Sequence, residues 1–297
     1  MTGYEGETYA ILSGLFWAIA VCFFKRGGAD MPAVSLNLFK NIIGVGLFAI
    51  TMPIAGQPLL IAAPSWDYAI LVLSGIVGMT LGDTVFFAAL KKMGASLWAI
   101  VSAFYGPSVI LMSYIVLDEE LGWLDLLGVA IIVGAIVLAS TKGDEFRNFD
   151  RQRLIGVGLG VLSLLLMAGG IVMMKPVLDR QPSLWATQVR LMGATASLFI
   201  MALIDRNRRR NFESMLPNAN WRYIVPGSVI GPYFALGFWI AGFKYTLAGK
   251  AAILNQLNTV FIFVFAWLFL RERLTWRKVL GLALALFGAF LIVGFQG

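Results

Sequence analysis

The chain has 297 residues, of which 59% are hydrophobic and only 13% are charged. An average soluble domain is about half apolar and a quarter charged, and a soluble fold could not hide this much apolar surface from water. The composition therefore predicts an all-α integral membrane protein. The net charge of +7 does not indicate nucleic-acid binding, because the basic residues lie in short groups between apolar runs.

The chemistry of the side chains is restricted as well. The sequence has one cysteine, Cys22, and no histidine, which excludes a disulfide framework and histidine-based metal or proton chemistry. No cofactor and no metal are expected. The first apolar run follows Glu5 and Glu7 instead of a basic segment, and no small-residue cleavage site comes after it, so we interpret it as a retained span.

Ten stretches approach the roughly 20 apolar residues that a helix needs to cross a bilayer. Pro32 and Pro182 open the second and the seventh, at helix positions where a missing backbone donor costs nothing. The lysines that end several spans, Lys25, Lys91, Lys175 and Lys244, are expected to reach the membrane interface. The predicted spans cover residues 8–24, 33–52, 67–90, 95–117, 122–140, 154–174, 183–204, 222–243, 248–270 and 276–295.

The basic residues predict an orientation. Seventeen of the 23 lysines and arginines fall in one set of alternate connections, and cytoplasmic loops are the ones enriched in these residues. The basic loops 141–153 and 205–222 are therefore predicted to be cytoplasmic, and both termini are predicted to lie outside the cytoplasm.

The chain after about residue 152 repeats the chain before it. At a distance of 150 positions, Lys25, Pro32 and Lys40 recur as Lys175, Pro182 and Arg190. Five predicted spans per half is an odd number, so the second half must cross the membrane in the opposite sense, as in many secondary transporters. At 153 positions, six further residues recur without a gap: Gly78, Lys91, Glu119, Leu121, Trp123 and Gly128 match Gly231, Lys244, Glu272, Leu274, Trp276 and Gly281.

These repeats carry a family resemblance. The segments 117–123 (LDEELGW) and 270–276 (LRERLTW), each followed by a Gly-rich span, resemble the paired EamA-type domains of the drug/metabolite transporter superfamily. The segment 82–91 resembles the end of that family's third span, and Pro107 resembles its fourth-span proline. The sequence departs from the pattern at Val260, which replaces the second proline, and many family members keep their termini in the cytoplasm.

The resemblance covers about residues 8–295. It implies ten transmembrane helices in two inverted five-helix repeats, and often an exporter of amino acids or related metabolites in a bacterial inner membrane. The expected domains are a first repeat at 1–140, a linker loop at 141–153 and a second repeat at 154–297.

Three ionisable residues lie inside predicted spans, where a charge costs roughly 2.5 to 3.5 kcal/mol, and each is a functional candidate for that reason. Lys40 and its repeat partner Arg190 could attract a substrate carboxylate, and Asp83 could bind an amine or take a proton. In the structural alternative, Asp83 pairs with a neighbouring cation, or Lys40 and Arg190 extend to the interface along their aliphatic stems.

A second candidate site follows from the repeat. Ser102 and Tyr105 in the fourth span correspond to Asn255 and Asn258 in the ninth, and each pair lies on one helix face near mid-span. Such groups could replace the water that a polar substrate loses, or they could only bond across helices. Pro107 should open the fourth span locally, because its ring clashes with the carbonyl of Ala103.

Aromatic and small residues complete the candidates. Trp17 and Trp98 could line an apolar part of the site, although most aromatic residues in spans only pack against helices or lipid. Small residues at helix-packing spacing predict close contacts between the inverted halves. The four glycines expected at these packing or hinge positions are Gly78, Gly82, Gly227 and Gly231.

The sequence thus predicts a secondary transporter of small polar metabolites, amino acids first, that works by alternating access in export or exchange. Its expected partners are the substrate and the lipid bilayer, with no nucleic acid, and it is expected to act as a monomer. The alternatives are a transporter of nucleobases, sugars, cations or drugs, and an intramembrane transferase, which would need a carboxylate cluster such as Asp118, Glu119 and Glu120. A channel is disfavoured because no charged pore ring is visible.

Overall fold

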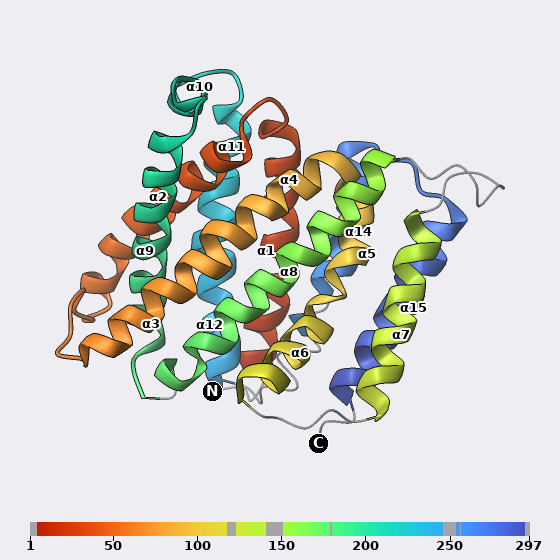
Figure 1. Ribbon diagram of the computed structural model, residues 1–297, viewed down its shortest axis with the longest axis horizontal. Helices are drawn as coiled ribbons and strands as arrows, with labels where there is room; N and C mark the ends of the chain where they lie inside the picture. The colour runs from red at the N-terminus through yellow and green to blue at the C-terminus, as the bar shows by residue number, and fades with distance from the viewer. Residues whose placement is uncertain are drawn as a thin grey trace.

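The computed structural model describes residues 5–117, 123–140, 151–178, 180–245, 254–255 and 257–294, and its regular elements are all helices (Figure 1). The first half holds α1 (Glu5–Gly27), α2 (Ala33–Ile54), α3 (Ser65–Gly75), the π-helix η1 (Ile76–Gly82), α4 (Asp83–Met93), α5 (Ala95–Ser102), α6 (Tyr105–Leu117) and α7 (Trp123–Ser140). The second half holds α8 (Arg151–Leu178), α9 (Ser183–Ile204), α10 (Arg208–Glu213), α11 (Trp221–Val229), the π-helix η2 (Ile230–Ala235), α12 (Leu236–Tyr245), α14 (Leu257–Leu270) and α15 (Trp276–Gly294).

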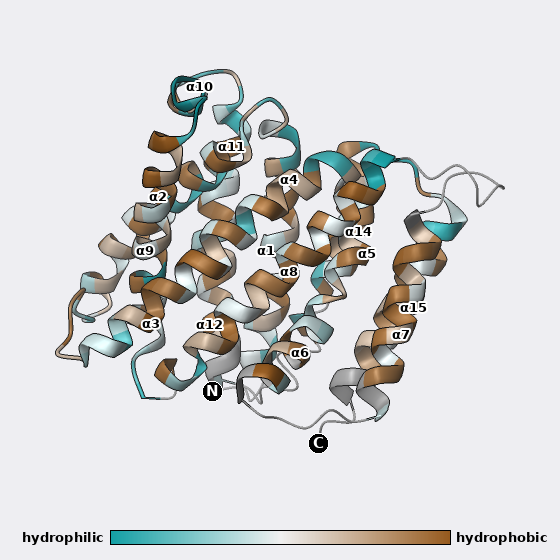
Figure 2. Cartoon of the chain, in the orientation of Figure 1, coloured by the Kyte–Doolittle hydropathy of each residue, from teal (hydrophilic) through white to brown (hydrophobic). Residues whose placement is uncertain are grey.

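Within the described residues, six helices are long and apolar enough to cross a membrane: α1, α2, α8, α9 and the continuous stretches Ser65–Met93 and Trp221–Gly242. The apolar bodies of these helices are brown in Figure 2. The other predicted spans correspond to α5 with α6, to α7, to α14 and to α15. The helical membrane fold is therefore confirmed, while the count of ten spans stays a prediction.

The two halves run in opposite directions. Figure 1 shows α1 leaving the N-terminal end of the molecule and α8 running back toward that end, with α7 and α15 antiparallel beside each other. The first helix of each half packs on the third helix of the other half: α1 contacts α11, η2 and α12, and α8 contacts α3, η1 and α4. These contacts and directions support the predicted inverted repeat, whose division into two five-helix units stays a prediction.

Each half interrupts its third helix with a π-helix at the equivalent place. η1 ends at Gly82 and η2 ends at Ala235, which are 153 positions apart. A π-helix inside an α-helix is rare and is frequent at functional sites, because it frees backbone groups and redirects side chains. Both π-helices lie where the halves meet, since η1 contacts α8 and η2 contacts α1.

Glycines allow the backbones to approach at these contacts. A Cβ atom added to Gly170 of α8 would lie 2.8 Å from the Cα atom of Gly78 in η1. A Cβ atom on Gly231 of η2 would lie 3.0 Å from the Cβ atom of Ala20 in α1. Gly82 and Gly227 lie in the same two interfaces. A Cβ atom added to Gly82 would lie 3.0 Å from Met167 Cγ of α8, and one added to Gly227 would lie 3.0 Å from Phe23 Cβ of α1.

The fourth span is broken in the middle. Helix α5 ends at Ser102 and α6 begins at Tyr105, and the amides of Ala103 and Phe104 bond three residues back, to Ile100 O at 3.3 Å and Val101 O at 2.9 Å. The break includes Ala103, whose carbonyl is the one that the ring of Pro107 is expected to displace. The interruption leaves polar backbone next to Ser102 and Tyr105.

The repeated glutamate motif ties the halves together at one end of the molecule. Glu272 Oε1 accepts the amide of Ala95 at 2.8 Å, and Oε2 accepts the amide of Ser96 at 3.1 Å and its hydroxyl at 2.5 Å. The carboxylate therefore caps the N-terminus of α5, whose first amides have no partner within the helix. Its repeat partner Glu119 lies outside the described residues.

Lysines at the same end also bond within the protein. Lys25 Nζ donates to Leu90 O at 2.7 Å and to Lys91 O at 3.2 Å, and Lys91 Nζ donates to Met31 O. The last carbonyls of α4 and the α1–α2 connection thus act as acceptors for these two lysines, and their position at the membrane interface stays a prediction. Figure 2 shows that polar residues gather at this end, around α10 and the ends of α4 and α8.

Candidate transport site

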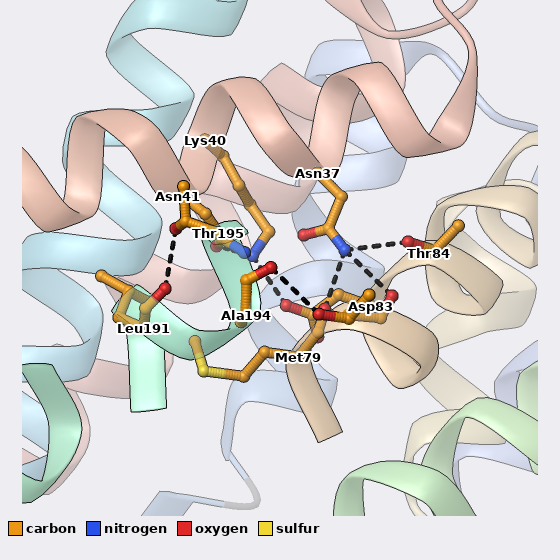
Figure 3. Close-up of polar contacts among 10 residues, drawn as sticks. Asn37, Lys40, Asn41, Met79, Asp83, Thr84, Leu191, Ala194 and Thr195 are labelled. Carbon is orange, nitrogen blue, oxygen red and sulfur yellow. Dashed lines mark hydrogen bonds and ion pairs between the residues drawn. The ribbon is translucent and has the colours of Figure 1, made fainter. Parts of the chain in front are cut away.

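The centre of the molecule holds a buried ion pair between α2 and α4. Lys40 Nζ lies 2.6 Å from Asp83 Oδ2 and donates a second hydrogen bond to Asn41 Oδ1 at 2.9 Å (Figure 3). The ammonium also lies 5.9 Å from the centre of the Phe87 ring. Both charges are buried, so the pair and its hydrogen bonds offset the loss of water.

Asn37 fastens this part of α2 to the π-helix η1. Its Nδ2 donates to Met79 O at 2.8 Å, to Thr80 O at 3.3 Å and to Thr84 Oγ1 at 2.9 Å. Figure 3 shows Asn37 and Lys40 side by side on α2, both pointing at the segment that carries Met79, Asp83 and Thr84. The carbonyls that the π-helix frees are thus held by a side chain, and the Asp83 carboxylate is held at a fixed place.

Arg190 approaches the same π-helix from α9. Its Nη2 lies 3.2 Å from where a Cβ atom of Gly78 would be, so the guanidinium lies directly on the glycine face of η1. Thr80 links the same two helices, because its Oγ1 donates to Ala194 O at 3.1 Å and contacts Ser197 Oγ at 2.6 Å. Arg190 is 8% exposed and does not extend to the interface.

Several polar atoms of α2 and α9 have no hydrogen-bond partner. Within the described residues these include Arg190 Nε, Gln188 Oε1 and Asn41 Nδ2, all of them buried. A buried polar group without a partner costs about 1–3 kcal/mol, and more if it is charged. Such groups are where a polar ligand would gain most by binding.

The second predicted cluster lies within reach of the first. The Arg190 guanidinium is within electrostatic range of both the Tyr105 hydroxyl and the Asp83 carboxylate. Next to Tyr105, Ser102 Oγ donates to Ala99 O at 2.7 Å and lies 3.4 Å from Thr259 Oγ1. The polar residues of α2, α4, α5 and α9 therefore form one region.

Asn258 completes this region from the second half. Thr259 Oγ1 donates to Asn258 Oδ1 at 3.1 Å, and a Cβ atom on Gly14 of α1 would lie 3.2 Å from the Asn258 backbone nitrogen. Asn258 and Asn255 are both half-buried. Part of the structural alternative is seen here, since Ser102 and Thr259 meet across helices.

The two candidate tryptophans lie together. The ring of Phe86 packs between them, 6.2 Å from the ring centre of Trp17 and 4.6 Å from that of Trp98. Trp98 is 3% exposed, and its indole Nε1 has no hydrogen-bond partner. Phe86 also contacts Phe87 at 4.8 Å, so an aromatic cluster runs from Trp17 and Trp98 to the ring beside Lys40.

We define the polar centre as Lys40, Asp83, Ser102, Tyr105, Arg190 and Asn258, with Asn37 and Thr259 as supporting residues. Its members come from both inverted halves, and its charged residues are buried. Sequence reasoning placed Thr80 on the face of Asp83 but did not identify Thr84 or Thr259, because single threonines in a span carry no distinctive spacing. A buried polar region between inverted halves defines the general class of membrane carriers with a central site.

Comparison with known proteins then gives the family. Residues 5–141 and 154–294 match the EamA-like transporter family, and the chain belongs to that family. The chain is accordingly a multi-pass membrane protein of a transporter family, and the resemblance to EamA-type domains is confirmed.

Individual relatives are distant. The chain is 22% identical to an uncharacterized transporter of Archaeoglobus fulgidus over 96% of each chain. It is 24% identical to the pseudopaline exporter CntI of Pseudomonas aeruginosa over 97% of this chain and 93% of that one. A solved crystal structure with 16% sequence identity superposes with a TM-score of 0.64 over 96% of this chain and 94% of the other, which supports the fold alone.

Proposed function

We propose that the chain is a secondary transporter that moves small polar metabolites, amino acids first among them, by alternating access in export or exchange. The observation that carries the proposal is the polar centre, in which buried charges of both signs lie where two inverted halves meet. Charges inside a membrane are costly and usually mark a substrate or ion pathway.

An amino acid fits the chemistry of this region. Its carboxylate matches Arg190, its polar groups can bond with Ser102, Tyr105 and Asn258, and its side chain can pack against the cluster that includes Trp98. Export is favoured over uptake because one relative is named as a pseudopaline exporter. Nucleobases, sugars, cations and drugs are the alternative substrates.

An intramembrane transferase is less well supported. The only dense carboxylate cluster of the sequence, Asp118 to Glu120, lies outside the described residues, and it belongs to the repeated glutamate motif. In the other copy of that motif, Glu272 is used to cap α5. A structural role of this kind leaves no obvious general base for transfer chemistry.

In the proposed arrangement, residues 1–140 and 154–297 form the repeats, and 141–153 links them. The protein acts as a monomer in a bacterial inner membrane, with the basic end cytoplasmic and the termini outside. Single cysteines at Thr2 and Ser214 test the orientation with a membrane-impermeant thiol reagent on intact cells. Modification at Thr2 alone is expected, and modification at Ser214 alone would reverse the orientation.

The function itself is tested by counterflow in liposomes. We expect purified protein to exchange at least one amino acid of a broad panel, and Asn258→Ala to weaken that exchange because it removes a polar group of the centre. Asn207→Ala, at an exposed loop position, is the matched control. No exchange across the panel by protein shown to be folded would contradict the amino acid proposal.

A further inference from the structure

The two cations of the polar centre are not equivalent. Lys40 and Arg190 occupy matching positions of the repeat, 150 residues apart, yet Lys40 is paired with Asp83. The residue that matches Asp83 in the second half, 153 positions on, is Leu236. The second half therefore places an arginine where the first places a lysine, but it supplies no carboxylate to go with it.

No other carboxylate is placed to neutralise Arg190. In the described part of the chain no ion pair to Arg190 is formed, and its Nε lacks any hydrogen-bond partner. Asp83 is within electrostatic range of Arg190, but its short contact is to Lys40. The other acidic residues that the structure describes lie in connections, in the short helix α10 or in the first turn of a helix, away from mid-span.

The charges of the centre consequently sum to one positive charge. Lys40 and Asp83 cancel, and Arg190 remains. An unpaired cation buried at this depth is costly, and a bound anion would remove that cost. The guanidinium geometry suits a carboxylate, to which arginine donates two parallel hydrogen bonds.

We infer that the substrate carries one net negative charge and that its carboxylate binds Arg190, while the Lys40–Asp83 pair stays intact. The inference rests on the proposed transport function and narrows it: among amino acids it selects acidic ones over zwitterions without net charge. Arg190 Nε, which lacks a partner, is then one donor for that carboxylate. The glycine face of η1 at Gly78 lets the guanidinium lie directly against the π-helix.

Amino acids and their amides provide the test, because they match in size and differ by one charge. Counterflow of labelled glutamate and aspartate into liposomes is compared with that of glutamine and asparagine. We expect the acidic member of each pair to be exchanged about tenfold to a hundredfold faster, the range that one charge-assisted hydrogen-bonded contact contributes. Equal or faster exchange of the amides would overturn the inference and leave the proposed function standing, whereas no exchange of any amino acid would overturn both.

Variants identify the group that binds the carboxylate. Arg190→Gln should reduce glutamate exchange by about tenfold to a hundredfold and spare glutamine exchange, because the centre becomes neutral. Arg206→Gln, at an exposed position in the connection after α9, is the control and should change neither. The double variant Lys40→Met/Asp83→Leu removes the ion pair and keeps the single positive charge, so it should still prefer glutamate.

Folding of each variant is checked by size-exclusion chromatography and thermal unfolding before transport is measured. If Lys40→Met/Asp83→Leu folds and loses the preference for glutamate while Arg190→Gln keeps it, Lys40 binds the carboxylate and the inference is wrong. If the double variant does not fold, the single variant Arg190→Gln tests the inference alone. An unchanged preference for glutamate over glutamine in Arg190→Gln would then overturn the inference.

Discussion

The surroundings of Lys40 and Arg190 show how an inverted repeat can keep its fold and change its chemistry. Both residues lie on the second helix of their half; Lys40 points at Asp83 in α4, and Arg190 points at Gly78 in η1. Around Lys40 the ion pair and the hydrogen bonds of the ammonium group are formed, by Asp83 and Asn41. Around Arg190 they are incomplete, and this difference makes the first region a structural support and the second a place for a ligand.

The largest effect is expected where the complete region is broken. Asp83→Leu introduces the residue found at the matching position of the second half and leaves Lys40 buried without a partner. It should lower the free energy of unfolding by about 3–5 kcal/mol, as removal of one member of a buried pair does. Unfolding by denaturant in detergent measures this. Lys40→Met/Asp83→Leu should recover most of the loss, and a single variant as stable as the native protein would contradict the pairing.

The two π-helices are held by different numbers of side-chain hydrogen bonds. The loss of Asn37, which bonds η1, should therefore lower stability more than the loss of Ser13, which bonds η2. Asn37→Ala removes the donor to Met79 O and Thr80 O and should lower the free energy of unfolding by about 1–3 kcal/mol, because it leaves buried carbonyls unsatisfied. Thermal unfolding compares it with Asn207→Ala, which is exposed. Equal stability of the two variants would show that η1 does not depend on Asn37.

A smaller loss is expected at η2. Ser13 Oγ of α1 donates to Ala235 O at 3.0 Å, which is one buried hydrogen bond instead of several. Ser13→Ala should therefore cost about 1 kcal/mol in the free energy of unfolding. Ser65→Ala, at an exposed position, is the control. A loss at Ser13 as large as that at Asn37 would mean that the two π-helices are held equally.

The smallest effect on stability is expected at Arg190. Arg190→Met removes a buried charge that has no ion partner among the described residues, so the midpoint of thermal unfolding should stay the same or rise. Glutamate exchange should nevertheless fall by about tenfold to a hundredfold, as in Arg190→Gln. A strong destabilisation, comparable to that of Asp83→Leu, would show that Arg190 is satisfied within the protein and would remove the contrast between the two regions.

Much of the fold could be predicted from the sequence, because the lengths of the apolar stretches and the nine repeated residues can be read without knowing any tertiary contact. The inverted halves follow from them, and Lys40, Asp83 and Arg190 are recognisable by the cost of placing charge in a span. The choice of Lys40 over Arg190 as partner of Asp83 could not be predicted. It depends on how α2 and α9 are rotated: α2 packs on α4 and bonds η1 through Asn37, and α9 packs on η1.

The π-helices could not be predicted either, since their stability comes from contacts such as that of Asn37 with Met79, and no local spacing announces them. The same holds for the hydrogen bonds of Lys25. Its carbonyl acceptors belong to α4, which is distant in the sequence and is brought near only by tertiary packing. Glu272 was recognised as a repeated residue, but its partners on α5 lie in the other half.

The most direct test of the polar centre as the transport site is protection of a cysteine by substrate. Ser102→Cys is treated with a small thiol reagent in liposomes, with and without an amino acid that the protein exchanges, and Ser214→Cys in the exposed loop after α10 serves for comparison. A site at the polar centre predicts that substrate slows modification at position 102 and leaves position 214 unchanged. Equal rates at position 102 with and without substrate, in protein that still exchanges it, would contradict that site.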